Sequence, residues 1–247
     1  MDHNTFINYL EADIARLEAI AAGSLTSAVP ACPGWDLARL IGHVGRVERM
    51  VLAVVPTGAM EPADPKSMES PPPDHDDLRA YFRSGATRLV TELRAKSPDA
   101  PAWNFMGTSL NVGFWSRRQA HEHAIHRWDA ESAIGPSTPI DAALAVDGID
   151  EYFEIVNSRV LPKRPDFALG GTAHLHATDI EGEWMLTPRA GGIDMAHGHG
   201  KGDAAIRASA SDLLLGLWGR LDLTEPDRFE LFGDTAIVQA LASVGGS

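Results

Sequence analysis

The sequence predicts an α+β chain of 247 residues, in which a helical bundle over residues 1–135 precedes a smaller α+β domain over residues 140–247. Before residue 135, four segments carry apolar residues at three- and four-residue spacing, which is typical of amphipathic helices. After the GPSTP segment at 135–139, short segments separated by glycines are typical of strands. This change from helical to strand-like sequence patterns predicts a linker at residues 135–139.

The first two helices follow from apolar stripes. Residues 4–22 carry the stripe Phe6, Leu10, Ile14, Leu17 and Ala21. Gly23 ends this pattern, and Asp36 is a suitable N-cap for the second helix because its carboxylate can accept hydrogen bonds from backbone N–H groups of the first turn. The second stripe is Leu37, Leu40, Ile41, Val44, Val47, Val51 and Val54. That helix is expected to end before Pro56.

Residues 56–73 contain six prolines and are expected to form a long surface connection. A third helix follows, with the stripe Leu78, Phe82, Leu89, Val90 and Leu93. A fourth is expected over residues 111–133, where two adjacent stripes recur at helical spacing. Two stripes indicate a helix that is buried on two sides.

The second half alternates strand and helix patterns. The segments AHLHATD, GEWMLTP and AAIRASA are typical of strands. Helical patterns at 141–160, 211–221 and 235–243 flank them, with Ser211 and either Asp234 or Thr235 as suitable N-caps. No internal repeat or low-complexity tract interrupts either half.

Composition excludes several classes of protein. With 21 Lys+Arg against 34 Asp+Glu the net charge is −13, so nucleic acid and anionic membranes are poor partners. The single cysteine, Cys32, excludes an intrachain disulfide and a cysteine-rich zinc module. The N-terminal segment is charged throughout, unlike a signal peptide, and no apolar run is long enough to span a bilayer. We expect a soluble, cytoplasmic protein.

Ligand-type side chains are densest at residues 121–126, in the middle of the fourth predicted helix. Glu122 and His126 lie about 40° apart on one face, one turn removed, so both can reach a single ion. His123 and His126 are the next option, at i,i+3. The H-E-x-x-H pattern of zinc proteases is excluded, because the second histidine comes one residue too late.

A third ligand must come from another helix. His43 is the one histidine within the second predicted helix, and its spacing from Leu40 and Val47 places it on the inward face. Together His43, Glu122 and His126 would form a site of two histidines and one carboxylate with open positions, suited to Zn²⁺ or another divalent metal. On spacing alone, hydrogen-bonded core histidines remain the alternative.

Two segments carry a family resemblance. VPACPGWDLARLIGHVGRVERM (29–50) and RRQAHEHAIHRWDAE (117–131) resemble the mycothiol-dependent maleylpyruvate isomerase family, a branch of the DinB-like metal-binding four-helix bundles. In that family a Cys-Pro-Gly-Trp turn precedes a helix with one histidine ligand, and a later helix carries E-x-x-x-H followed by R-W-D. The matching positions here are His43, Glu122 and His126. The segment SDLLLGLWGR (211–220) resembles a helix of the family's sterol-carrier-like C-terminal domain.

The resemblance implies an enzyme that uses mycothiol on a divalent metal, Zn²⁺ or another. Coordination would hold the thiol as a thiolate, which adds to the cis double bond of maleylpyruvate, allows rotation and then leaves. A related S-transferase would stop at the conjugate. The alternative from a different class is a non-catalytic, metal-containing protein that binds a small molecule or lipid, and an open coordination position discriminates between the two.

The family isomerase is also expected to supply an arginine from its C-terminal domain for an anionic substrate. Arg220 matches best and Arg207 is the competitor, while closing a helix at its C-terminus is the structural alternative for Arg220. Asp129 lies one turn beyond His126 and can hydrogen-bond a ligand histidine. Cys32 is expected to be a small buried residue and not a nucleophile.

Two further histidine pairs have ligand-like spacing. His174 and His176 are expected to share one strand face. His197 and His199 lie in the glycine-rich AHGHGKGD, which we interpret as a turn. Neither pair has a third partner that spacing supports, so we predict no metal role for either. GHGKG also lacks the context of a phosphate-binding loop.

Overall fold

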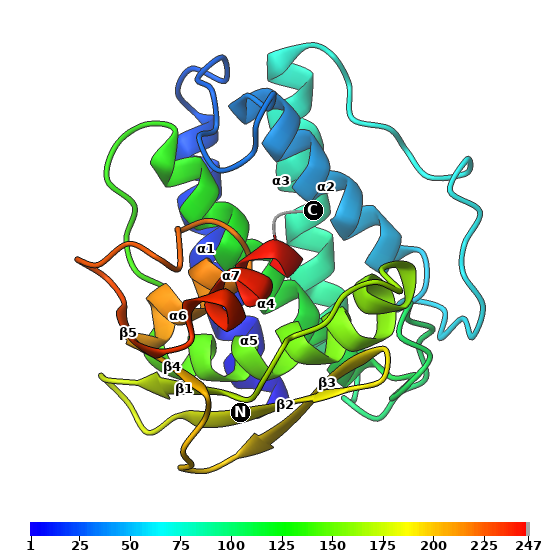
Figure 1. The fold of residues 1–247 in the computed structure, drawn as a ribbon. Coiled ribbons are helices and arrows are strands. Elements are labelled where there is room, and N and C mark those ends of the chain that lie inside the picture. Colours follow the sequence, from blue (N-terminus) through cyan, green and yellow to red (C-terminus); the bar gives the residue numbers. More distant parts are fainter. Residues whose placement is uncertain (246–247) are drawn as a thin grey trace. The chain divides into compact units, whose positions relative to one another are not determined.

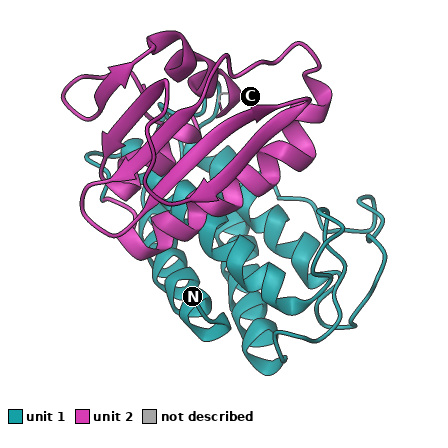
Figure 2. Ribbon diagram, turned by 60° about the horizontal axis from the view of Figure 1, so that its bottom comes forward, with its two compact units in different colours: residues 1–138 teal, residues 139–247 magenta. Residues whose placement is uncertain are grey.

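The computed structural model describes residues 1–245 and divides the chain into two compact units, Met1–Thr138 and Pro139–Ser247 (Figure 2). The first unit is helical, and the second combines a sheet with helices. The observed fold confirms the predicted α+β class. None of the helices described is both long and apolar enough to cross a membrane.

Four helices form the first unit (Figure 1): α1 (His3–Ala21), α2 (Leu37–Leu52), α3 (His75–Ala95) and α4 (Val112–Ser132). Each begins after a residue whose side chain accepts backbone N–H groups of the first turn, namely Asp2, Asp36, Asp74 and Asn111. The proline-rich stretch between α2 and α3 contains no regular helix or strand, as its composition predicts.

Helix α4 is buried on two sides, as its two stripes predict. His121 and Ile125 are buried on one side, while Trp115, His126 and Asp129 are buried on the adjacent one. Helix α1 packs along α4, and α2 packs along α3. This places ligand-type side chains of α4 in the interior, where they need polar partners.

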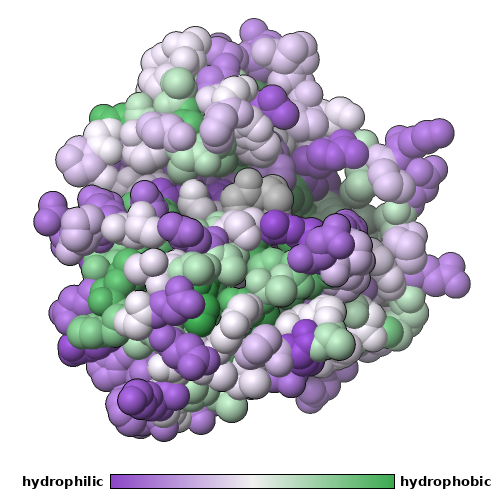
Figure 3. All heavy atoms as spheres, in the orientation of Figure 1, coloured by the Kyte–Doolittle hydropathy of each residue, from purple (hydrophilic) through white to green (hydrophobic). Residues whose placement is uncertain are grey.

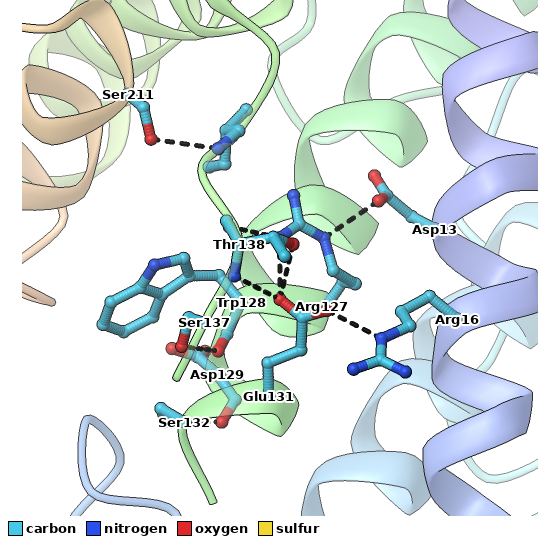
Figure 4. Close-up of polar contacts among 11 residues, drawn as sticks. Asp13, Arg16, Arg127, Trp128, Asp129, Glu131, Ser132, Ser137, Thr138 and Ser211 are labelled. Atoms are coloured by element: carbon cyan, nitrogen blue, oxygen red, sulfur yellow. Dashed lines mark hydrogen bonds and ion pairs between the residues drawn. The ribbon is translucent and has the colours of Figure 1, made fainter. Parts of the chain in front are cut away.

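A buried ion network fixes α1 against α4 (Figure 4). Glu131 accepts hydrogen bonds from Arg16 Nε at 2.7 Å and from Arg127 Nη1 at 3.0 Å. Thr138 adds its backbone N–H and its hydroxyl, each 2.8 Å from Glu131 Oε2. Arg127 Nε also donates to Asp13 Oδ1 at 3.1 Å. The network joins two helices and the end of the first unit.

The second unit contains a five-stranded sheet of order β3-β2-β1-β4-β5. Its strands are β1 (Ala173–Ala177), β2 (Glu183–Arg189), β3 (Gly192–His197), β4 (Ala204–Ala208) and β5 (Glu230–Gly233). The β1–β4 pair is parallel and the other neighbours are antiparallel. Strands β3 and β5 were not expected, because their segments together contain a single β-branched residue, Ile193.

The helices of this unit are α5 (Ala142–Ile155), α6 (Ala210–Leu217) and α7 (Thr235–Gly245). After α5 the chain continues as a π-helical turn, Val156–Val160. The predicted N-cap Ser211 is wrong: Ser209 caps α6 by accepting from the Asp212 N–H. Ser211 is instead a residue of α6 itself, and its hydroxyl accepts a hydrogen bond from the Ile140 backbone N–H at 3.0 Å (Figure 4).

The surface is mixed in polarity. On the face shown in Figure 3, hydrophilic and hydrophobic residues are interspersed. Large hydrophobic side chains that are exposed include Met60, Ile134 and Phe232. Such isolated exposed residues are normal for a folded protein.

Candidate metal centre in the helical bundle

Helices α2 and α4 bring the three predicted ligand residues together. His43 lies on α2, and Glu122 and His126 lie one turn apart on α4. Glu122 Oε1 is 3.2 Å from His43 Nε2 and 3.2 Å from His126 Nε2. One donor atom from each residue lies within 4.8 Å of the others. The two imidazoles meet edge to face, with ring centroids 5.0 Å apart.

The Glu122 carboxyl is held in its charged form. Burial by itself would raise its pKa, but the Arg118 guanidinium and the His126 imidazole outweigh burial and hold the pKa well below its usual range. Arg118, which lies one turn before Glu122 on α4, forms an ion pair with Glu122 Oε2. One carboxylate oxygen is thereby anchored, and the other faces the two imidazoles.

His126 is oriented by a second carboxylate. Its Nδ1 donates to Asp129 Oδ2 at 3.0 Å, as the one-turn spacing predicts. Burial lowers the pKa of His126, but Glu122 and Asp129 together raise it to about 9. Ligand histidines commonly donate their second ring nitrogen to a carboxylate in this way, which leaves Nε2 for the ion. The Cys32 thiol also donates to Asp129 Oδ2, at 3.6 Å.

These residues fit a divalent cation. Tetrahedral bonds of about 2.0–2.1 Å to nitrogen and oxygen require donor atoms about 3.3 Å apart. Both nitrogen–oxygen distances from Glu122 Oε1 are 3.2 Å. The donor set of two imidazoles and one carboxylate is one that zinc and similar metals take in catalytic sites, with a further position left for water or substrate.

An open groove of about 420 Å³ lies beside the cluster, lined by residues that include Trp35, Arg39, His43, Arg46 and prolines 71–73. The His43 side chain is 37% exposed, so the cluster is accessible from this side. Arg39 and Arg46 flank His43 on the same face of α2. Within the described residues neither guanidinium forms an ion pair with a carboxylate, although Arg39 lies over the Trp35 ring, 4.8 Å from its centroid.

Sequence profiles of one family match both units. The profile described as the mycothiol maleylpyruvate isomerase N-terminal domain matches residues 10–131, and the MDMPI C-terminal domain matches residues 143–240. The chain belongs to the mycothiol maleylpyruvate isomerase family. It is an enzyme of this isomerase family, and the match extends through both halves of the chain.

Solved structures of mycothiol-dependent maleylpyruvate isomerase share this fold. One is 14% identical in sequence with a TM-score of 0.64, and the match covers 94% of this chain and 93% of the chain in that structure. A variant of that enzyme with one histidine replaced by alanine is 15% identical with a TM-score of 0.65, at the same coverage. A search of curated proteins found no match.

The other histidines of α4 do not join the cluster. His123 is fully buried, and its Nε2 lies 3.3 Å from Glu48 Oε1 while its Nδ1 donates to the Gln119 carbonyl at 2.9 Å. The alternative pairing of His123 with His126 therefore does not form. For His123 the hydrogen-bonded core interpretation is the right one.

The predicted substrate arginine lies in the second unit. Arg220 follows α6, and its Nη1 donates to the Trp218 carbonyl at 2.9 Å. Its competitor Arg207 pairs across strands β4 and β5 with Glu230, at 3.0 Å. The cross-strand pair is an interaction that a structural residue would make. The roles of Arg207 and Arg220 both stay predictions.

Sequence reasoning missed Arg39 and Arg46 as groove residues. The signal was present, because Arg39 lies four residues before His43 and Arg46 three residues after it. On a helix this spacing puts all three on one face. Arg118 was also missed, although it lies four residues before Glu122.

Proposed function

We propose that this chain is a divalent-metal-dependent and mycothiol-dependent isomerase that acts on an electrophilic, anionic small molecule of the maleylpyruvate type. The observation that carries the proposal is the cluster of His43, Glu122 and His126, whose donor atoms face one point beside an open groove. Family membership supports the thiol and the reaction class.

The metal would be held by Nε2 of His43 and His126 and by Oε1 of Glu122. When bound, zinc or another divalent cation favours the thiolate over the thiol at neutral pH. Asp129 holds His126 in the orientation that presents Nε2, and Arg118 holds Glu122 through Oε2. Both anchors keep the donor atoms in place before any ligand arrives.

When bound, mycothiol would supply a thiolate that can add to an activated cis double bond and leave again, with the electron pair of that bond held in the meantime by the conjugated carbonyl of the substrate. The chain's own task is to bind and orient the substrate. Arg39 and Arg46 provide positive charge on the groove side of His43, where a substrate carboxylate would be attracted. Trp35 adds an apolar wall to the groove. The role of Arg220 as a substrate cation rests on the family resemblance alone.

The same site could also carry out S-conjugation, when the adduct between the thiol and the electrophile does not release the sulfur again. In that case the product would retain the carbon–sulfur bond and the chain would act as an S-transferase. The chemistry of the electrophile decides between these outcomes, and the protein residues involved are the same.

The test is isomerisation of maleylpyruvate by purified full-length protein, with and without mycothiol and Zn²⁺. We expect activity only when both are present, and loss of that activity in Glu122→Gln, which keeps the shape of the side chain but removes its charge. His75→Ala is the matched control, because His75 lies at the start of α3 and outside the cluster. A rate that does not depend on mycothiol, or one that Glu122→Gln leaves unchanged, would refute the proposal, while a stable conjugate would identify an S-transferase.

A further inference from the structure

A second cluster of histidines lies on the sheet of the second unit. His174 and His176 share one face of β1, and the antiparallel register places Glu183 of β2 directly opposite His176. The segment after β3 returns over this face and brings His199 to the same place. One donor atom from each of these four residues lies within 4.8 Å of the other three.

Three imidazoles surround one carboxylate. His176 Nδ1 is 2.6 Å from Glu183 Oε1, and His199 Nδ1 is 3.2 Å from the same oxygen. His174 Nε2 lies 4.0 Å from Glu183 Oε2. The rings of His174 and His199 meet edge to face with centroids 5.1 Å apart. Imidazole nitrogens and a carboxylate oxygen are ligands that zinc prefers.

His174 provides an independent indication of a missing ligand. It is only 6% exposed, and its Nε2 has no hydrogen-bond partner among the described residues although it is turned toward Glu183. A buried polar atom without a partner is costly, and such atoms are rare in native proteins.

Glycines allow His199 to approach the sheet. Gly198 has φ of +126°, a conformation that other residues rarely adopt. A Cβ on Gly200 would lie 2.8 Å from Met185 Sδ, so this segment lies directly on the strand below it. The motif AHGHGKGD is thus built to hold one histidine, His199, against the face that carries His174.

We propose that His174, His176, Glu183 and His199 form a second divalent-metal site that takes zinc. The site differs from the bundle cluster in offering four protein ligands, the number found in closed structural zinc sites. Its role would be to fasten the connection between β3 and β4 to the sheet. His197 is not part of it, because its Nε2 lies 3.3 Å from Asp150 Oδ1 instead.

Binding requires only small movements. A tetrahedral ion needs donor atoms about 3.3 Å apart. The separations from the Glu183 oxygens now range from 2.6 Å for His176 to 4.0 Å for His174, so shifts of about 1 Å suffice. His199 is the most exposed of the four, with 78% of its side chain accessible, so it has room to shift. The carboxylate, which now accepts hydrogen bonds from two imidazoles, would turn to the ion.

The experiment counts zinc in the full chain after the bundle cluster has been disabled by His43→Ala together with Glu122→Gln. After dialysis against a weak chelator we expect about one equivalent of zinc to remain. Adding His199→Ala removes it, whereas adding the matched control His197→Ala retains it. His199 and His197 are both exposed, so neither replacement threatens the fold.

Absence of zinc in the disabled chain, or zinc that survives both His199→Ala and Glu183→Gln, would overturn the proposal. In the first case the cluster is a hydrogen-bonded group without a metal. This outcome is separate from the test of the bundle cluster, because the disabled chain lacks that site. With cobalt in place of zinc, we also expect a spectrum that an added thiol does not change, since four protein ligands leave no position for sulfur.

Discussion

The two histidine clusters of this chain use the same residue types on different frameworks. In each, one carboxylate lies between imidazoles. The bundle cluster has three ligand-type residues on two helices, and the partly exposed His43 faces a groove. The sheet cluster has four such residues, which lie on two strands and on a glycine-rich connection. One of them, His174, is buried beneath that connection.

The difference teaches how a fold sets the number of ligands. A helix offers two ligand-type side chains one turn apart, and its neighbour offers one more, so a metal bound there would keep a position open toward the groove. Adjacent strands supply side chains on one face at close spacing, and a returning segment closes the set. An open set suits a reaction and a closed set suits a structural role. The predictions below test that contrast.

The largest effect is expected from His126→Ala. Loss of a buried ligand should remove one equivalent of metal and lower thiol-dependent activity at least about 1000-fold, because the reactive thiolate depends on the ion. Metal content and initial rates measure both. Cys32→Ser is the matched control, since a hydroxyl can replace the thiol as donor to Asp129. Full metal content in His126→Ala would contradict the ligand assignment.

Glu131→Gln separates stability from metal binding on the same helix. The buried Glu131 carboxylate is shared by Arg16, Arg127 and Thr138, so its neutralisation should cost about 3 kcal/mol of unfolding free energy. Denaturant unfolding measures this loss, and the zinc content of the folded protein should not change. Lost zinc together with unchanged stability would reverse the roles given to the two carboxylates.

The same variant carries a pH signature. Burial alone would raise the pKa of Glu131, but Arg16, Thr138 and Arg127 together lower it. The stability that this group contributes is present above its unfolded pKa and is lost as pH falls through the lower folded value. The stability of the parent chain should therefore decline below about pH 4.5, and that of Glu131→Gln should decline less. If the unfolding free energies of the two chains decline equally as the pH falls, this interpretation of Glu131 is contradicted.

Asp129→Asn should lower the affinity of the bundle cluster for its metal about 10- to 100-fold, because an amide orients and polarises the His126 ring less well than a carboxylate. Competition with a chromophoric chelator measures the affinity. Asp76→Asn is the control, since Asp76 is an exposed residue of α3. An affinity that Asp129→Asn leaves unchanged would mean that the hydrogen bond to His126 Nδ1 has no part in metal binding.

The smallest effect is expected from the groove. Arg39→Gln and Arg46→Gln should each raise KM for an anionic substrate about tenfold, which corresponds to about 1.4 kcal/mol, and leave metal content unchanged. Arg83→Gln provides the comparison, because Arg83 is an exposed arginine of α3 away from the groove. If KM does not change in either variant, the substrate does not use this face of α2.

The bundle cluster could be predicted from sequence because helical spacing fixes it. Glu122 and His126 are brought together by one turn of a single helix, and the inward spacing of His43 selects the third residue. Helix boundaries were equally predictable where aspartate or asparagine caps precede apolar stripes. Arg39 and Arg46 were within reach of the same reasoning, since they share the helix face of His43.

The sheet cluster could not be predicted in the same way. Placing Glu183 opposite His176 requires the register of β1 and β2, which no local pattern fixes. Placing His199 there requires that the segment after β3 fold back over the sheet, and its glycines, when seen only in sequence, are equally typical of a free turn. The π-helical turn after α5 also lacks a signal, since its residues continue the pattern of the helix.

The most direct test of the central claim is a titration of cobalt-substituted protein with mycothiol. The account predicts a thiolate-to-cobalt absorption that saturates at about one equivalent of thiol per chain, is absent in His126→Ala and persists in His199→Ala. Cobalt that binds to the bundle cluster at one equivalent but gives no absorption change with the thiol would contradict it. That result would leave His43, Glu122 and His126 as a metal site without an open position for sulfur.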